Sequence, residues 1–203
     1  MAVASPYVLV LYYSRHGATA KMAELIASGI ESASNMEARL RTVPAVSPDT
    51  TASQPPVPEA GAVYCTEDDP RHCAGLALGS PTRFGNMAAA MKHFWDSTGS
   101  LWATGALIDK PAVTFTSSSS MHGGQESTLL SMMLPLLHHG MVIGGVPYST
   151  PALMRTQSGG TPYGPSHVAG NDSNLPLSDD EQEICLATGK RLGKLAQQLQ
   201  ESV

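Results

Sequence analysis

The segment Val8–Thr19 constrains the fold of this chain more than any other. A continuous run of apolar, β-branched and aromatic residues over Val8–Tyr13 leads directly into the turn Ser14–Thr19, and helical periodicity follows. This order is typical of a buried parallel strand that ends at the amino terminus of a helix. The free N–H groups of a first helical turn and the positive end of the helix dipole favour an anion there. The segment therefore predicts a phosphate site.

Length and composition favour one well-buried domain. The chain has 203 residues, of which 42% are hydrophobic and 14% are charged, which suits a single core and argues against disorder. We therefore predict one domain over residues 1–203. The formal net charge of -5 and a pI of about 5.7 argue against a nucleic-acid partner, which requires a basic surface.

The sequence shows no sign of secretion or of a membrane segment. The first basic residue is Arg15, so no cationic region precedes the first apolar run and no signal peptide is predicted. The uncharged stretch Leu129–Val146 contains Pro135 and Gly140, which indicate a buried helix, a turn and a buried strand rather than a membrane span. The cysteines lack C-x-x-C spacing and are interpreted as reduced thiols. We expect a cytoplasmic protein.

Hydrophobic periodicity predicts strands that alternate with helices. The predicted strands are Val8–Tyr13, Met36–Val43, Ala74–Leu78, Pro111–Thr116 and Met141–Gly145. The predicted helices are Thr19–Ser34, a segment after Asn86, Gln125–His138, and a last helix that starts with a capping box at Ser178 and Glu181. Residues 44–73 and 147–177 are predicted to be irregular surface excursions. This order predicts an α/β, flavodoxin-like, doubly wound five-stranded parallel sheet of order 2-1-3-4-5, with helices on both faces.

Three unusual loops follow predicted strands and should meet at the carboxyl edge of the sheet, where ligands of such folds bind. They are Ser14–Thr19, Ser80–Asn86 and Thr116–Gly124. The chain lacks a Walker A loop and a G-x-G-x-x-G motif, which argues against nucleoside triphosphate hydrolysis and against a dedicated dinucleotide domain. FMN is the leading candidate ligand, with the hydroxyls of Ser14 and Thr19 and the amides of the first helical turn as phosphate donors.

Several of these features also have ordinary structural interpretations. The first loop alone is equally compatible with a plain β–α turn. His138 lies where a histidine commonly caps a helix, and Ser117–Ser120 has the composition of a linker. Trp102 is compatible with core packing and with a subunit interface. Because His138 and His139 are adjacent, they point to different faces of a helix, and no metal site is predicted.

Five further motifs follow one another along the chain. They are Ser80–Met87 (SPTRFGNM), Leu101–Leu107 (LWATGAL), Gly123–Glu126 (GGQE), His138–Val142 (HHGMV) and Gly159–Gly164 (GGTPYG). In type and order they resemble the motifs of the WrbA-type NAD(P)H:quinone oxidoreductases, a family of flavodoxin-like FMN enzymes. The resemblance runs from Val8 to the final helix.

This resemblance implies an oxidoreductase that uses NADH or NADPH to reduce quinones to hydroquinones by ping-pong, two-electron hydride transfer on bound FMN. The implied FMN-binding residues are Ser14, Arg15, His16, Gly17, Ala18, Thr19, Pro81, Thr82, Arg83, Phe84, Gly85, Asn86, Ser117, Ser118, Ser119, Ser120, Met121, His122, Gly123 and His138. His138 matches the family histidine beside the flavin and is the implied catalytic residue. Trp102 and His16 are the implied substrate-binding residues, and the family often carries tyrosine at the position of His16. The resemblance also implies a homotetramer in which neighbouring subunits complete each pocket.

Two alternative functions remain at this point. The first is a flavodoxin-type single-electron carrier, which a small acidic FMN domain would suit. The two long excursions and the segment Leu101–Leu107 argue against it, because they suggest walls around the flavin that a carrier does not need. The second is a non-catalytic flavin-binding interaction protein, which the intact hydroxyls and glycines of the loops disfavour.

Overall fold

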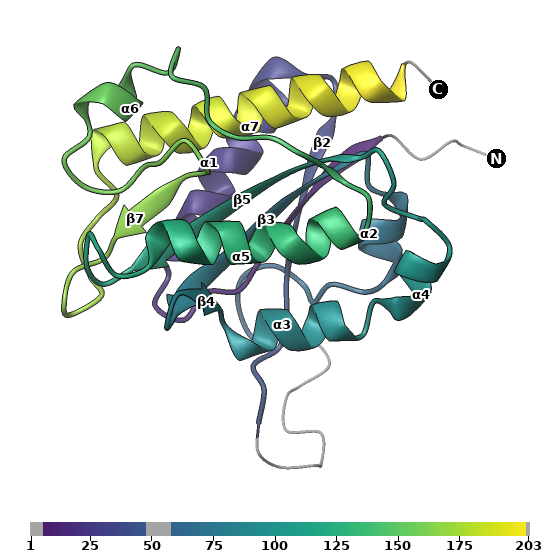
Figure 1. The fold of residues 1–203 in the computed structure, drawn as a ribbon, viewed down its shortest axis with the longest axis horizontal. Coiled ribbons are helices and arrows are strands. Elements are labelled where there is room, and N and C mark those ends of the chain that lie inside the picture. Colours follow the sequence, from purple (N-terminus) through teal and green to yellow (C-terminus); the bar gives the residue numbers. More distant parts are fainter. Residues whose placement is uncertain (1–5, 48–57, 202–203) are drawn as a thin grey trace.

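A parallel sheet with helices on both sides organises the chain, as Figure 1 shows for the computed structural model, which describes residues 6–47 and 58–201. The strands are β1 (Tyr7–Tyr12), β2 (Glu37–Thr42), β3 (Gly75–Arg83), β4 (Asn86–Met87), β5 (Pro111–Ser118), β6 (Val142–Ile143) and β7 (Ser166–Val168). The helices are α1 (Ala18–Ala33), α2 (Asp68–His72), α3 (Ala89–Asp96), α4 (Gly99–Ala103), α5 (Gln125–His138), α6 (Ala152–Arg155) and α7 (Asp179–Gln200).

The main strands lie in the order β2-β1-β3-β5-β6 and are parallel to their neighbours. The short strand β4 stands outside this path, because it pairs only with β3 and runs antiparallel to it. When β4 is left out of the count, the order is 2-1-3-4-5. The predicted α/β flavodoxin-like sheet is therefore confirmed.

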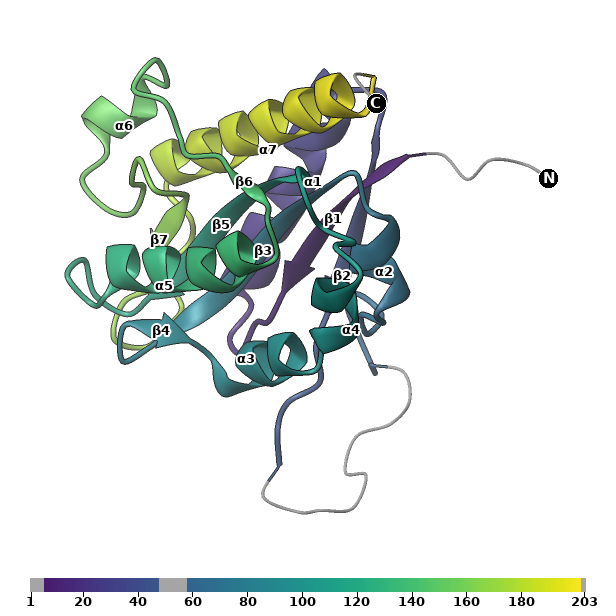
Figure 2. The same ribbon diagram turned by 45° about the vertical axis from the view of Figure 1, so that its right-hand side comes forward.

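Both faces of the sheet are buried, which explains the continuous apolar run of the first strand. Val8 and Val10 belong to the core beneath α1 and α7, together with Ile26 and Leu192. Leu9 and Leu11 point to the other face and belong to the core that α3 and α5 cover. Figure 2 shows the two helical layers on opposite sides of the sheet. Side chains of successive strand residues alternate between these two cores.

Strand β3 is longer than the predicted strand Ala74–Leu78. It continues to Arg83, because its register with β5 extends as far as the pair Pro81 and Ser117. Beyond that point β3 turns back into β4 through a two-residue connection, Phe84 and Gly85. The predicted end was wrong because the apolar pattern stops at Leu78 while the backbone pairing goes on.

The outer strand beside β5 is divided between two distant parts of the sequence. Strand β6 pairs with the start of β5, and it is shorter than the predicted strand Met141–Gly145. Strand β7 pairs in parallel with the other end of β5, over Thr116–Ser118. The prediction of an irregular segment over 147–177 was therefore wrong for β7 and for the short helix α6. Figure 1 shows β7 and β4 at the left of the molecule, close to the start of α5.

The helices agree better with the sequence. Helix α5 has the predicted bounds Gln125–His138, and α7 begins at the predicted capping box of Ser178 and Glu181. In the excursion over 44–73, the structure places α2 and a bridge between Thr42 and Tyr64, whereas positions 48–57 lie outside the described residues. Among the described helices, none has both the length and the hydropathy that crossing a membrane requires.

Candidate functional site

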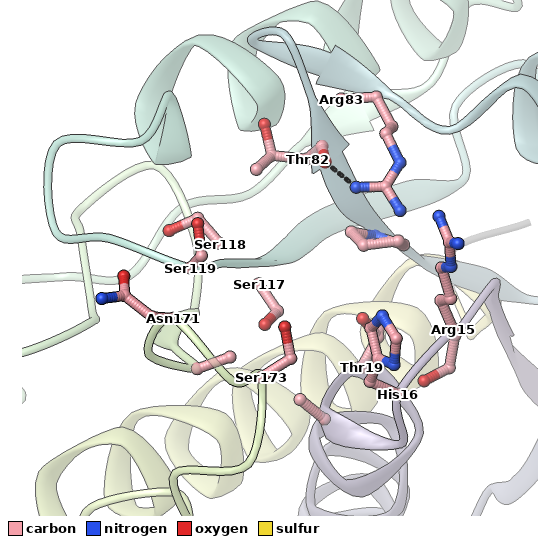
Figure 3. A pocket seen from close by; sticks show the side chains of 14 residues that line it. Arg15, His16, Thr19, Thr82, Arg83, Ser117, Ser118, Ser119, Asn171 and Ser173 are labelled. Carbon is pink, nitrogen blue, oxygen red and sulfur yellow. Dashed lines mark hydrogen bonds between the residues drawn. The ribbon is translucent and has the colours of Figure 1, made fainter.

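A cavity of about 290 Å³ opens at the carboxyl edge of the sheet. Its walls are formed by the β1–α1 turn, the end of β3, the end of β5 and the segment after β7. The lining residues are Ser14, Arg15, His16, Ala18, Thr19, Pro81, Thr82, Arg83, Ser117, Ser118, Ser119, Ala169, Asn171 and Ser173. Figure 3 shows these side chains grouped around one opening. The three loops singled out in the sequence thus converge.

The first wall is the amino terminus of α1. Gly17 stands at the N-cap with a φ of 93°, a conformation that favours glycine. Its N–H donates to Ser14 Oγ at 3.2 Å, and Lys21 N–H donates to the carbonyl of Gly17 at 3.0 Å. The amides between these two positions have no partner within the helix. Since the first turn holds no acidic residue and Thr19 lines the cavity, this wall favours a phosphate.

The second wall is the end of β3, which carries Thr82 and Arg83. The hydroxyl of Thr82 lies 2.6 Å from that of Thr128 and ties this strand to α5. Arg83 and Arg15 bring two positive charges to the cavity, and none of the lining residues carries a carboxylate. A second cavity of about 340 Å³ shares these two arginines and extends toward α3. The site therefore has a positive charge balance that suits an anionic ligand.

Phe84 forms the tip of the β3–β4 hairpin beside the cavity. Its φ of 51° lies in the left-handed region, and Gly85 follows with a φ of 76°. Two-residue hairpins of this kind usually carry asparagine or glycine at the first position. The side chain of Phe84 is also fully exposed. A bulky aromatic residue that is both strained and solvated points to a functional role.

The third wall combines the end of β5 with the segment after β7. Ser118 Oγ donates to the carbonyl of Ser120 at 2.6 Å and accepts from Gln125 Nε2 at 2.9 Å. The N–H of Ala169 donates to the carbonyl of Ser118 at 2.7 Å. Through this pairing, Asn171 and Ser173 reach the cavity. Neither residue was predicted from the sequence, although the turn-forming run Gly170–Ser173 was a possible signal.

All the predicted FMN-binding residues except His138 fall into two groups. Those of the first group line the cavity: Ser14, Arg15, His16, Ala18, Thr19, Pro81, Thr82, Arg83, Ser117, Ser118 and Ser119. Those of the second group belong to the same loops without lining it: Gly17, Phe84, Gly85, Asn86, Ser120, Met121, His122 and Gly123. His138, the remaining predicted residue, lies elsewhere.

His138 and Trp102 are remote from the cavity of their own chain. His138 ends α5, about 20 Å along the helix from its first residue Gln125, which contacts Ser118. Trp102 lies on α4, at the right of Figure 1, with 62% of its surface exposed. The side chain of His138 is exposed, whereas the neighbouring His139 is buried against Trp95 and Thr98. Within one chain, neither predicted residue reaches the site.

The described residues contain no group of three histidine, cysteine or acidic side chains placed to hold a metal ion. The polar groups of the cavity are instead hydroxyls, backbone amides, two guanidinium groups, the imidazole of His16 and the carboxamide of Asn171. These are ligands for phosphate and polar ring edges, and they fit a flavin mononucleotide.

Comparison with known proteins agrees with this geometry. The flavodoxin family model matches residues 10–140. The chain is 43% identical over 197 residues to the NAD(P)H dehydrogenase (quinone) of Chromohalobacter salexigens, covering 95% of this chain and 98% of that protein. It is 41% identical over 204 residues to the NAD(P)H dehydrogenase (quinone) of Geotalea daltonii, with coverage of 95% and 97%.

Solved structures show the same fold. A WrbA-like flavodoxin from Agrobacterium tumefaciens superposes with a TM-score of 0.67 at 23% identity, covering 96% of this chain and 99% of that one. A flavodoxin from the domain Archaea superposes with a TM-score of 0.61 at 19% identity, covering 94% and 98%. The resemblance inferred from the motifs is confirmed, and the chain belongs to the flavodoxin family, among relatives named NAD(P)H dehydrogenase (quinone).

Proposed function

We propose that this protein is an FMN-dependent NAD(P)H:quinone oxidoreductase that reduces quinones to hydroquinones by two-electron transfer. The observation that carries the proposal is the carboxylate-free cavity between the amino terminus of α1 and the two arginines Arg15 and Arg83. The names of the relatives, which match 95% of the chain, supply the reaction class.

The phosphate of FMN is assigned to the first wall. The amides at the start of α1 and the hydroxyls of Ser14 and Thr19 would donate to its oxygens, while the helix dipole stabilises its charge. Thr19 is only 2% exposed and lines the cavity, so a ligand there would meet a side chain that is held in place by its neighbours. The neighbouring hydroxyls of Ser117 and Ser173 suit the ribityl chain, because they line the same cavity.

The flavin ring is assigned to the space between the second and third walls. Pro81–Gly85 would pack along one side of the ring and Ser117–Gly123 along the other, with Phe84 as an aromatic surface at the rim. When bound, FMN accepts a hydride from NADH or NADPH and passes two electrons to a quinone. His16 would face the nicotinamide, since it lines the cavity. The residues of the chain contribute position, polarity and exclusion of water.

Trp102 and His138 are assigned to the cavity of a neighbouring subunit in a homotetramer. The support for this assembly is an apolar stripe on the outer face of α5, where Leu130, Leu134 and Leu137 are 45%, 59% and 55% exposed. These residues recur at helical spacing, so they form one continuous strip. Exposed apolar strips of this kind mark interaction surfaces. A partner packed there would cover the strip and bring in the two aromatic groups that one chain cannot supply.

An anaerobic titration tests the reaction. The full-length protein is saturated with FMN, its visible spectrum is recorded, and NADH or NADPH is added in stoichiometric steps before benzoquinone. Complete bleaching by one equivalent and rapid recovery of the spectrum with quinone are expected. A persistent blue semiquinone without quinone turnover would instead identify a flavodoxin-type carrier. A protein that stays colourless in excess FMN would contradict the proposal and point to a binding protein without flavin.

A further inference from the structure

The third wall of the cavity depends on a loop that two buried charged residues hold in place. The loop runs from Ala169 to Leu175 and is closed by a hydrogen bond from Leu175 N–H to the carbonyl of Ala169 at 3.0 Å. Asn171 and Ser173 lie within it and line the cavity. Directly before this loop stands His167, the central residue of β7, which is paired with Ser117 of β5.

His167 bridges the loop and α7. Its Nδ1 lies 2.9 Å from Glu181 Oε2, and its Nε2 lies 3.1 Å from the carbonyl oxygen of Leu175. The side chains of His167 and Glu181 are each 1% exposed. A neutral imidazole has one N–H, whereas both of these ring nitrogens face acceptors. Only the imidazolium form satisfies both contacts.

Glu181 has the hydrogen bonds of a carboxylate anion. Its two oxygens accept from the backbone N–H groups of Gly159 at 2.8 Å, Val168 at 3.1 Å and Ser178 at 2.8 Å. A protonated carboxyl would have to present a hydrogen to one of these donors. Burial raises the pKa of Glu181, but the bonds from His167 and from the backbone amide of Ser178 outweigh burial and leave that pKa lowered. The pair is therefore a buried ion pair, which is stable only when its remaining hydrogen bonds are satisfied.

We propose that His167, held as an imidazolium by Glu181, is a positioning residue that fixes the loop Ala169–Leu175 against the cavity. The identity of the ligand, FMN, rests on the proposed function, whereas the protonation of the His167 ring does not. His167 touches neither the cavity nor its ligand, since it is not among the lining residues. It acts through Leu175, whose carbonyl it binds.

A neutral ring with its proton on Nδ1 would instead present a lone pair of Nε2 to the carbonyl of Leu175, and the two would repel each other. The titratable groups near the ring are few: Glu181 faces it from α7, and Cys185 lies one turn further along that helix with a buried thiol. Asp180 and Glu183 are engaged by Arg155 at the exposed side of α7. From β5, the facing residue is the uncharged Ser117.

The proposal has two measurable consequences in the full-length protein. First, nitrogen-15 NMR should show a proton on each of the two ring nitrogens of His167 in the folded protein, because both face acceptors. Second, FMN affinity should depend on the bond between His167 Nε2 and Leu175, so that removing this bond weakens binding about tenfold, as for the loss of one charge-assisted hydrogen bond.

The variant His167→Asn separates positioning from folding. An asparagine retains a donor near the position of Nδ1 for Glu181 but is too short to reach Leu175. We expect it to fold and to bind FMN about tenfold more weakly than the natural chain. The matched control is His93→Asn, which alters an exposed histidine on α3 and should keep the FMN affinity of the natural chain.

Two outcomes would overturn the inference: a His167 ring with one unprotonated nitrogen, or a folded His167→Asn variant that binds FMN as tightly as the natural chain. If the variant does not fold, the ring spectrum of the natural chain still decides. Failure of the proposed function is distinguishable, because a protein that binds no FMN would still show its ring protonation by NMR.

Discussion

Gly29 of α1 and Gly189 of α7 face each other where the two helices cross, and a β-carbon built on either would lie 3.0 Å from the α-carbon of the other. On Gly189 that β-carbon would also lie 2.1 Å from the carbonyl oxygen of Ile26. The backbones therefore meet without side chains between them. This close contact fixes the position of α1 against α7, and the amino terminus of α1 forms the proposed phosphate site.

The variant Gly189→Ala should consequently destabilise the fold. We expect a loss of about 2 kcal/mol in the free energy of unfolding, because the methyl group meets backbone atoms and forces the helices apart. Urea denaturation followed by circular dichroism measures it. Gly99→Ala is the control, since a β-carbon there meets nothing within 4 Å. A denaturation midpoint for Gly189→Ala equal to that of the natural chain would show that the helices can separate freely.

Negative charge at the start of α1 should prevent FMN binding. The variant Thr19→Glu places a carboxylate against the proposed phosphate position, and we expect the affinity for FMN to fall more than about a hundredfold, or about 3 kcal/mol. Fluorescence quenching of FMN measures the affinity. Ser28→Glu introduces the same charge at an exposed position further along the helix and should leave binding nearly unchanged. Equal affinity in the two variants would place the phosphate elsewhere.

Phe84 should combine a cost in stability with a benefit in activity. Asparagine tolerates its φ of 51° better than phenylalanine does, so Phe84→Asn should raise the free energy of unfolding by up to about 1 kcal/mol. The quinone reductase activity of the same variant should decrease, because the aromatic surface at the rim is lost. Thermal unfolding and kcat/KM for benzoquinone measure the two effects. An unchanged kcat/KM would remove Phe84 from the site.

The core of the fold was predictable because its signals are local. Val8–Tyr13 is apolar on both faces, as a central parallel strand requires, and Gly124 and Gly140 bracket α5 at its two ends. These features depend on neighbouring residues along the chain. The loops that end β1, β3 and β5 were predictable for the same reason, and the topology then brings them to one edge.

The remaining features depend on partners that are distant in the sequence. Strand β7 is three residues long, Ser166 to Val168, and exists because the end of β5 offers it hydrogen bonds. No apolar pattern marks it, so Asn171 and Ser173 were missed as lining residues. His138 is a different case. The family motif identifies it, but one chain places it at the far end of α5, and only an assembly would return it to a site.

The buried histidine at the end of α5 should give the protein an acid-sensitive stability. Burial lowers the pKa of His139 below 6.5, and the neighbouring His138 lowers it further. The neutral ring of His139 stabilises the folded state fully at pH values above 6.5, the pKa in the unfolded chain. This contribution to the free energy of unfolding is lost as the pH falls from 6.5 through the lower pKa of the folded state. Thermal unfolding between about pH 8 and about pH 5 should show this loss, since the buried ring of His139 must become protonated in acid.

The variant His139→Gln tests the origin of that acid sensitivity. Glutamine can still donate to the hydroxyl of Thr98, which His139 Nε2 contacts at 3.0 Å, but it does not titrate. Its melting temperature should therefore change less between about pH 7 and about pH 5 than that of the natural chain. His72→Gln, at an exposed position of α2, should keep the natural profile. If the melting temperature of His139→Gln changed with pH as much as that of the natural chain, the acid sensitivity would belong to other groups.

The apolar stripe on α5 gives the prediction that links assembly to activity. Leu134 lies at its centre and is 59% exposed in the single chain. If a second subunit covers it, the variant Leu134→Glu buries an unpaired carboxylate at the interface, which costs several kcal/mol and should leave monomers. Light scattering measures the mass of the assembly. The activity per bound FMN should fall at least about tenfold, because Trp102 and His138 would no longer reach the cavity of a neighbouring subunit.

Leu199→Glu is the matched control for the assembly, because it makes the same exchange at an exposed leucine of α7, on the opposite layer of the molecule. This variant should keep the mass and the activity of the natural chain. FMN affinity should be little changed in Leu134→Glu, since the first wall of the cavity belongs wholly to one chain. Monomers with full activity would show that Trp102 and His138 play no part in catalysis, and an intact oligomer would show that the stripe is covered by nothing in the assembly.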